Sequence, residues 1–179
     1  MQDINFLKSF GNAPTTMVKK GEILLRNGDN SDWFFYVEKG CLRSYTIDSK
    51  GKEHVFQFAP EDWLISDQES IMNNGLAILN IDAIEDSQIK IIKRPSEKPM
   101  TGMDKELLLY MNNKLLRKIY SQQKRIIQLL SSSAEERYIE FIKLYPNLAQ
   151  RVPQKMIASY LGITPESLSR VRKELVKKK

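Results

Sequence analysis

Residues 157–175 read IASYLGITPESLSRVRKEL and decide the fold of the C-terminal part of this 179-residue chain. Ile157 and Leu161 stand four residues apart, so they share one face of a short helix. Gly162 follows where a helix-ending residue in the left-handed conformation is expected. Thr164 is a good N-cap for a second helix, with a proline behind it at the first helical position. The stretch therefore predicts two short helices joined by a three-residue turn.

The second of these helices presents a polar and basic face. Leu168, Val171 and Leu175 form an apolar stripe that predicts its buried side. This pattern is typical of a helix-turn-helix, whose second helix meets base edges in the major groove of DNA. A plain helical hairpin is the alternative interpretation, because such hairpins are common. On the outer face the sequence places Glu166, Ser167, Ser169, Arg170, Arg172 and Lys173.

The net charge of +6 is unevenly distributed along the chain. Residues 150–179 contain eight basic and two acidic residues, so the whole surplus lies in this segment. A basic end on an otherwise balanced chain indicates a polyanionic partner. A solubilising tail is the alternative, since the last three lysines alone supply half of the surplus.

The first 100 residues predict a β-domain. Short apolar and aromatic segments are separated by turn residues such as Gly21, Gly28, Gly40 and Gly51. Strands at this spacing predict an antiparallel sandwich or barrel. The expected strands include residues 22–25, 33–37, 41–47, 54–58 and 87–92.

A long helix is predicted over residues 101–132. Its seam positions recur in two rows with the a/d pattern of a coiled coil. A helix of about 30 residues is ~45 Å long, too long to pack wholly on one small domain. We expect a two-stranded coil between protomers; the alternative is a helix packed on the β-domain of its own chain. The rows are Leu108, Leu115, Gln122 and Leu129, and Asn112, Ile119 and Ile126.

The remaining residues predict helices. Ser133 and Glu136 form a capping box at the start of a helix that Pro146 ends. A loop is expected over residues 146–151, before the helix-turn-helix. The predicted domains are therefore 1–100, 101–132 and 133–179.

Residue counts exclude several classes of protein. One cysteine, Cys41, and one histidine, His54, leave no multi-histidine metal site and no four-cysteine zinc or iron–sulfur site within one chain. No phosphate-binding loop or hydrolase motif is present, so we expect no enzyme. No stretch approaches the ~20 apolar residues that span a membrane, and no secretory signal opens the sequence. A cytoplasmic protein without a membrane partner is expected.

The order of these features resembles the CRP/FNR family of bacterial transcription regulators. Residues 20–24 (KGEIL) with Gly28–Asp29 match the family's opening hairpin, and Gly40–Arg43 match its next turn and strand. The most specific match is residues 157–175, which are similar to the version in the Bacteroidetes branch, where the effector is often unknown. The resemblance covers about residues 13–179.

The resemblance implies an α+β chain. An N-terminal antiparallel β-roll (a double-stranded β-helix of the cyclic-nucleotide-binding type) precedes a long dimerisation helix and a C-terminal helix-turn-helix domain of winged-helix type. The sequence ends at Lys179, so the family's wing is expected to be missing or vestigial. The implied partners are a second copy of the chain, a pseudo-palindromic site in double-stranded DNA, and RNA polymerase. The alternative is a ligand-binding or protein-interaction module whose helix-turn-helix does not read DNA.

The resemblance also implies which residues contact DNA. The family's Glu-x-x-Ser-Arg motif matches Glu166, Ser169 and Arg170, the arrangement of FNR-like members that read a TTGA-type half-site. Arginine binds guanine through two hydrogen bonds, and a carboxylate accepts from cytosine N4. Pro165 replaces an arginine of CRP-like members, so one base contact is expected to be lost. Thr164 and Ser167 complete the expected base-reading set, and the expected phosphate contacts are Gln154, Lys155, Arg172 and Lys173.

The expected effector segment departs from the family pattern. Cyclic-nucleotide-binding members use a Gly-Glu pair and an Arg-Ser or Arg-Thr pair; here Ser66 and Asp67 fall at the first pair, and Ala77 and Ile78 at the second. Without the arginine, a cyclic phosphate would be buried without its cation. We expect no cyclic AMP binding in the usual way, no iron–sulfur cluster and no haem. An unknown small-molecule effector and no effector at all both remain open.

Overall fold

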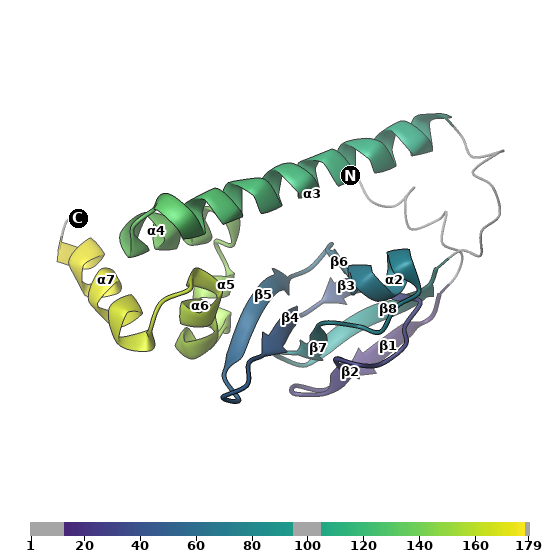
Figure 1. Cartoon of the computed structure of the whole chain (residues 1–179), viewed down its shortest axis with the longest axis horizontal. Helices are drawn as coiled ribbons and strands as arrows, with labels where there is room; N and C mark the ends of the chain where they lie inside the picture. Colours follow the sequence, from purple (N-terminus) through teal and green to yellow (C-terminus); the bar gives the residue numbers. More distant parts are fainter. Residues whose placement is uncertain (1–12, 95–104, 178–179) are drawn as a thin grey trace. The chain divides into compact units, whose positions relative to one another are not determined.

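The computed structural model describes residues 13–94 and 105–177 (Figure 1). The chain divides into two compact units, residues 1–99 and residues 100–179, and each is described by itself. Within the described residues, the first unit contains the strands and one short helix, and the second contains only helices.

Residues 13–94 of the first unit form two four-stranded antiparallel sheets and one short helix. One sheet has the strand order β1-β8-β3-β6 and the other the order β2-β7-β4-β5. This arrangement confirms the predicted antiparallel β-roll. The strands are β1 (Thr15–Val18), β2 (Ile23–Leu25), β3 (Trp33–Lys39), β4 (Leu42–Ile47), β5 (Glu53–Ala59), β6 (Leu64–Ile65), β7 (Asn80–Ala83) and β8 (Ser87–Lys93), and helix α2 (Gln68–Asn73) lies between β6 and β7.

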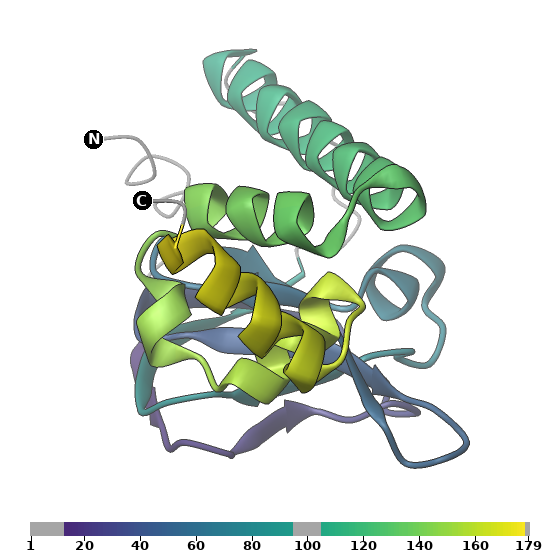
Figure 2. The same cartoon turned by 90° about the vertical axis from the view of Figure 1, so that its left-hand side faces the viewer.

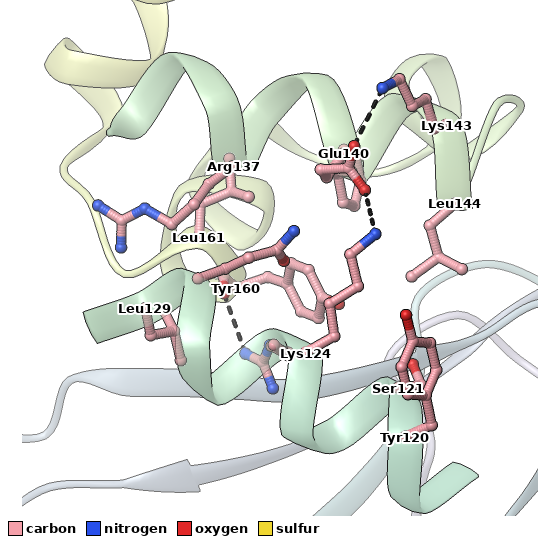
Figure 3. A pocket seen from close by; sticks show the side chains of 13 residues that line it. Tyr120, Ser121, Lys124, Leu129, Arg137, Glu140, Lys143, Leu144, Tyr160 and Leu161 are labelled. Atoms are coloured by element: carbon pink, nitrogen blue, oxygen red, sulfur yellow. Dashed lines mark hydrogen bonds and ion pairs between the residues drawn. The ribbon is translucent and has the colours of Figure 1, made fainter. Parts of the chain in front are cut away.

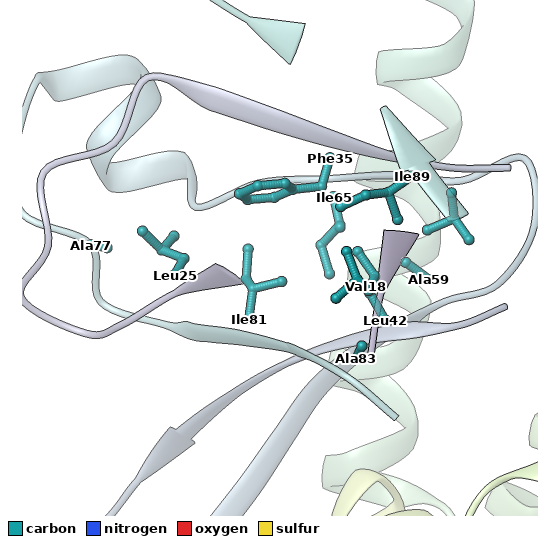
Figure 4. Packing of buried hydrophobic residues seen from close by; sticks show 11 residues of the cluster. Val18, Leu25, Phe35, Leu42, Ala59, Ile65, Ala77, Ile81, Ala83 and Ile89 are labelled. Atoms are coloured by element: carbon teal, nitrogen blue, oxygen red, sulfur yellow. The ribbon is translucent and has the colours of Figure 1, made fainter. Parts of the chain in front are cut away.

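The apolar core of this unit lies between the two sheets (Figure 4). Phe35, Ile65 and Ile89 come from the first sheet, and Leu42 and Ile81 from the second. Successive side chains of a strand point to opposite faces of its sheet, so each strand contributes only alternate residues. Burial of each large side chain contributes about 1.5–3 kcal/mol to folding, which makes this cluster the main source of stability for the unit.

The sequence did not predict β1, β6 or α2. These elements are short, and their main partners are distant in sequence. Strand β1 pairs with β8, with Thr15 opposite Lys90, and β6 pairs with β3, with Ile65 opposite Phe35. Tertiary pairing of this kind is invisible to local periodicity.

Among the described glycines, Gly40 leaves the least space for a side chain. Gly40 has a φ of +96°, and a Cβ atom there would lie 2.3 Å from Ser87 Oγ and 2.8 Å from Ser87 Cα. The Cys41 N–H donates to the same Ser87 Oγ at 3.2 Å. Only glycine therefore satisfies both the backbone conformation and the close approach of β8.

We predict that Gly40→Ala lowers the free energy of unfolding by about 2–5 kcal/mol, because left-handed strain and a steric clash add together. Gly51→Ala is the matched control, since Gly51 has a φ of +75° but nothing within 4 Å of its Cβ position. The control should cost only about 1–2 kcal/mol. Urea denaturation followed by the fluorescence of Trp33 and Trp63, both in this unit, measures the difference. Equal losses in the two variants would contradict this account.

In residues 105–177 the second unit has one long helix followed by four shorter ones. A capping box starts the first of the shorter helices: the Glu136 N–H donates to Ser133 Oγ at 3.2 Å, and the Ser133 N–H donates to Glu136 Oε2 at 2.7 Å. The sequence predicted a loop over residues 146–151, whereas the structure has a one-turn helix there. The helices are α3 (Lys105–Ser131), α4 (Ala134–Leu144), α5 (Leu148–Arg151), α6 (Gln154–Leu161) and α7 (Pro165–Lys177).

Aromatic side chains fill the space between α4 and α6. The Phe141 ring centroid lies 5.4 Å from that of Tyr145 and 5.6 Å from that of Tyr160, and the Tyr145 and Tyr160 rings meet edge to face at 6.0 Å. Such pairs add about 0.5–1.5 kcal/mol beyond simple burial. This cluster holds α6, and through α6 the turn to α7, in place.

Candidate nucleic-acid interface

The turn between α6 and α7 is fixed by backbone hydrogen bonds. Gly162 ends α6 in the left-handed conformation, with a φ of +66°. Its N–H donates to the Ser159 carbonyl at 3.1 Å, and the Ile163 N–H donates to the Ala158 carbonyl at 3.0 Å. These bonds satisfy carbonyls that the helix end would leave without partners, as in a Schellman motif. The structure confirms the predicted turn.

Thr164 and Ser167 hold the start of α7. The Ser167 N–H donates to Thr164 Oγ1 at 3.2 Å, which is an N-cap bond, and the two hydroxyl oxygens lie 3.3 Å apart. The sequence analysis expects both as base-reading residues. Their hydroxyl oxygens contact each other at the start of α7, and base reading by the two side chains stays a prediction.

Helix α7 buries one side and exposes the other. Leu168 is fully buried and Val171 nearly so, where α7 packs on α6 and α4 (Figure 2). Glu166 and Arg170 are exposed, and Ser169 is half-buried. The predicted apolar stripe therefore faces the helical core, and the motif residues face outward.

The outward side chains gather on one surface, which we call the α7 surface. One shallow groove is lined by Pro165, Glu166, Ser169, Arg170 and Lys173, and a second by Gln154, Ser169, Arg172, Lys173, Val176 and Lys177. Ser169 and Lys173 border both grooves. The predicted base-reading and phosphate-binding residues therefore form one continuous surface. Lys155 is exposed on α6 but lines neither groove.

Opposite charges stand one helical turn apart on the α7 surface. Hydrogen bonds from its own backbone N–H and from the Thr164 hydroxyl lower the pKa of Glu166, so the carboxylate is ionised near the positive end of the helix. Arg170 lies four residues on, and within the described residues its guanidinium makes no hydrogen bond or ion pair. A hydrogen-bond acceptor and a bidentate donor are therefore both available to a ligand.

The predicted seam of α3 is largely exposed in the single chain. Leu115, Ile119 and Ile126 are 56%, 55% and 58% exposed, and Leu129 is 42% exposed. Asn112 is also exposed, whereas Leu108 and Gln122 are half-buried. A row of large apolar side chains in water is unfavourable by about 1.5–3 kcal/mol per side chain relative to burial.

In the predicted effector segment, one carboxylate accepts hydrogen bonds from three backbone N–H groups. Asp67, only 1% exposed, caps α2: its Oδ1 accepts from the Ser70 N–H at 3.0 Å. Its Oδ2 accepts from the N–H groups of Ile78 and Leu79 at 3.1 and 3.0 Å. Ala77 is buried, Ile78 is exposed, and Ser66 Oγ accepts from Gln68 Nε2 at 2.9 Å. The backbone donors of this segment are thus taken by the chain's own carboxylate.

His54 contacts a carboxylate, and Cys41 lies in the protein core. His54 Nε2 lies 2.8 Å from Asp48 Oδ2, and this contact, together with backbone N–H groups, lowers the pKa of Asp48 to about 2. Cys41 is fully buried in the β-roll. In residues 13–94 and 105–177, no group of three His, Cys, Asp or Glu side chains is placed to hold a metal ion. No helix in the described part of the chain is both long and apolar enough to cross a membrane.

Comparisons with known proteins agree with this architecture. Residues 15–97 match the family model of the cyclic nucleotide-binding domain. Regulatory protein HlyX of Actinobacillus pleuropneumoniae is 28% identical over 172 residues, which cover 86% of this chain and 68% of HlyX. The chain spans about two thirds of the length of the curated relatives it matches.

Two solved structures illustrate the shared fold. FixK2 from Bradyrhizobium japonicum superimposes with a TM-score of 0.78 at 20% identity, covering 93% of this chain and 85% of FixK2. A CRP/FNR-family transcriptional regulator from Thermus thermophilus gives a TM-score of 0.67 at 18% identity, covering 92% of this chain and 87% of that regulator.

The β-roll and the helix-turn-helix surface together define a two-unit protein: a cyclic nucleotide-binding domain joined to a helical unit that carries a helix-turn-helix. The chain is similar in sequence to the regulatory proteins named by these comparisons and shares the fold of CRP/FNR-family transcription regulators. The expected CRP/FNR resemblance is thereby confirmed.

Proposed function

We propose that this protein is a homodimeric, sequence-specific DNA-binding transcription regulator. The observation that carries the proposal is the α7 surface, on which Glu166, Ser169 and Arg170 are held outward by a helix whose other side is buried. RNA polymerase is the further partner that this function implies, and the proposed location is the cytoplasm.

The proposed base contacts follow from hydrogen-bonding chemistry. The Arg170 guanidinium donates two hydrogen bonds to guanine O6 and N7, and the Glu166 carboxylate accepts from cytosine N4. Ser169 supplies a hydroxyl to the same edge. Gln154, Arg172 and Lys173 border the second groove and contact phosphates, which fix orientation rather than sequence. Lys155, exposed on α6, adds a further phosphate contact.

A dimer provides the geometry for a two-part site. Pairing of two copies of α3 along Leu115, Ile119, Ile126 and Leu129 would cover the exposed seam. The two copies of α7 then enter successive major grooves about 34 Å apart on a pseudo-palindrome. Asn112 and Gln122 are polar seam members that favour a single register.

The β-roll is proposed not to bind cyclic AMP in the family's usual way. Ala77 stands where a phosphate-binding arginine is expected, and Asp67 already accepts from the Ile78 and Leu79 N–H groups. A cyclic phosphate would meet a buried carboxylate instead of a cation, which is unfavourable. A less anionic effector, or DNA binding without any effector, is compatible with this arrangement.

The alternative function is a protein-interaction module that uses the same helix-turn-helix. Salt dependence separates the two: contacts to about six phosphates lower affinity by orders of magnitude between low and moderate salt, whereas an apolar protein interface responds much less. The basic residues around α7 favour DNA.

The first prediction concerns sequence reading. In vitro selection from random DNA with ligand-free protein should enrich a two-fold-symmetric site. On that site Arg170→Ala should cost about 1–3 kcal/mol, with little loss on random DNA, because Arg170 reads a base.

The matched control is Lys173→Ala, in the same groove. It should weaken binding about equally on both DNAs and reduce the salt slope by roughly 1. Fluorescence anisotropy at several salt concentrations measures both effects. Equal losses of affinity for Arg170→Ala on both DNAs would mean that Arg170 contacts only a phosphate. If the selection enriches no site, the prediction that the protein reads DNA without an effector is wrong.

The second prediction concerns assembly. Ile126→Asp should weaken the dimer more than a hundredfold, since two buried isoleucines contribute about 3–6 kcal/mol. Ile127 is equally large and similarly exposed, at 54%, but lies about 100° around the helix from Ile126. Ile127→Asp should change the dissociation constant by about threefold or less. Sedimentation equilibrium gives both constants, and equal effects of the two variants would argue against this seam.

The third prediction concerns the effector. Isothermal titration calorimetry with cyclic AMP should give no binding heat at micromolar concentrations, because the cyclic phosphate lacks a cation and its backbone donors are occupied. A family member with the intact Gly-Glu and Arg-Ser pairs serves as the positive control. Saturable micromolar binding would overturn the prediction.

A further inference from the structure

A cleft in the second unit has no part in the proposed DNA contacts. It lies between α3, α4 and α6 (Figure 3) and has a volume of about 330 Å³. This is the lower end of the range of small-ligand sites, roughly 300–1,000 Å³. It corresponds to roughly ten water molecules, so it has room for more than a single inorganic ion.

The charges that line the cleft are unbalanced. Lys124, Arg125, Arg137 and Lys143 supply four cations, against the single carboxylate of Glu140. Glu140 lies 2.7 Å from Lys124 Nζ and 3.0 Å from Lys143 Nζ, so both lysines approach the same carboxylate (Figure 3). These contacts lower the pKa of Glu140 and keep it ionised. With that carboxylate shared by the two lysines, the lining keeps a net positive charge.

Arg137 is the most unusual residue of the cleft. Its Nε is buried and has no hydrogen-bond partner, and within the described residues its guanidinium takes part in no ion pair. In Figure 3 the side chain extends toward the side of Leu129, away from Glu140. A buried donor without a partner is costly, and such groups in native proteins usually meet a water or an ion.

Arg125 adds a second guanidinium from the long helix. It stacks on the Tyr160 ring with its Cζ 4.1 Å from the ring centroid, and it donates to the Tyr160 carbonyl at 3.0 Å. Burial lowers the pKa of Arg125, and the neighbouring tyrosines oppose this only in part. An added negative charge nearby would favour the buried cation.

We propose that this cleft binds a small organic anion, in which a phosphate or carboxylate group lies at Arg137 and Arg125 and an apolar portion lies on Leu129 and Leu144. Arginine suits the first part because its planar fork matches both oxyanions. The apolar side chains of the lining suit the second, and the net positive lining excludes a cationic ligand.

The cleft and the proposed dimer seam occupy different sides of α3. Lys124 and Ser121 line the cleft and lie about 160° and 140° around the helix from Ile126, whereas Arg125 and Leu129 lie at the border between the cleft and the seam. A bound anion and the partner helix would therefore meet only at this border and would otherwise occupy different sides of α3. Because it would touch α3, α4 and α6 together, it would also hold the helix-turn-helix against the long helix. This last consequence rests on the proposed function, whereas binding itself does not.

The test is a titration of the full chain, without DNA, followed by the arginine Nε–Hε signals in a ¹⁵N–¹H spectrum. The probes are sodium pyrophosphate and sodium benzoate, as phosphate and carboxylate sources, each against sodium chloride at equal ionic strength. We expect a saturable shift of the Arg137 Hε signal with at least one probe. A site with a Kd of ~1 mM reaches about 90% saturation at roughly 10 mM probe.

Two charge variants make the result specific. Arg137→Gln should weaken probe binding about tenfold or more, followed at the backbone signals of Tyr160 and Leu161, because a charge-assisted hydrogen bond is lost. Arg117→Gln removes the same charge from α3 outside the cleft and should leave the affinity unchanged. Glu140→Gln should tighten binding severalfold, since it removes the one negative charge; a purely structural role of Glu140 predicts no such gain.

The proposal is overturned if no signal saturates with either probe, if sodium chloride causes the same shifts, or if Arg137→Gln binds as tightly as the unaltered chain. It is also overturned if DNA, but neither small anion, moves the Arg137 signal. In that case Arg137 contacts a DNA phosphate. Loss of DNA binding by the chain would leave the titration result standing, so the two proposals fail separately.

Discussion

The packing of Leu168 and Val171 against α6 and α4 is the constraint on which the DNA-facing surface depends. Leu168 is fully buried, so the rotation of α7 about its own axis is set. That rotation decides which side chains can reach a ligand, because positions one and two residues away from the buried stripe point outward. The Schellman turn at Gly162 and the Thr164 cap then fix where the helix begins. Recognition chemistry at Glu166 and Arg170 is therefore a consequence of apolar packing a few ångströms away.

Much of this arrangement could be predicted from local sequence. The Gly-Ile-Thr-Pro turn, the Ser133 capping box and the long period-seven helix have short-range physical causes, and the structure has all three. Strands with strong apolar runs were also predictable. The short strands β1 and β6 were not, because each exists only through pairing with a strand far along the chain. Helix α5 was missed because a single turn between Pro146 and Pro153 has no periodicity to detect.

The site residues divide along the same line. Sequence could name Glu166, Ser169 and Arg170, but it could not tell that the hydroxyl groups of Thr164 and Ser167 are engaged with each other. The sequence shows that Ala77 stands in place of an arginine, but it does not show that the Asp67 carboxylate accepts hydrogen bonds from the backbone of this segment. Three backbone N–H groups from two segments converge on that one carboxylate. In this protein the segment is held by an internal anion, and its conformation does not depend on a ligand to satisfy those donors.

Because the donors of the effector segment are already paired, the long helix is the other element to consider as the place where a signal is received. In the proposed function, this chain could act without a small molecule, bind a less anionic effector in the β-roll, or receive its signal elsewhere. Helix α3 has the properties needed to receive a signal outside the β-roll. One side carries an exposed apolar seam, the opposite side carries Lys124, and Arg125 lies between the two; Lys124 contacts α4 and Arg125 contacts α6 directly. These contacts include the Lys124–Glu140 ion pair and the Arg125–Tyr160 hydrogen bond, and charged contacts of this kind respond to a nearby anion. An anion that joins these side chains would hold the helix-turn-helix against α3, as proposed above.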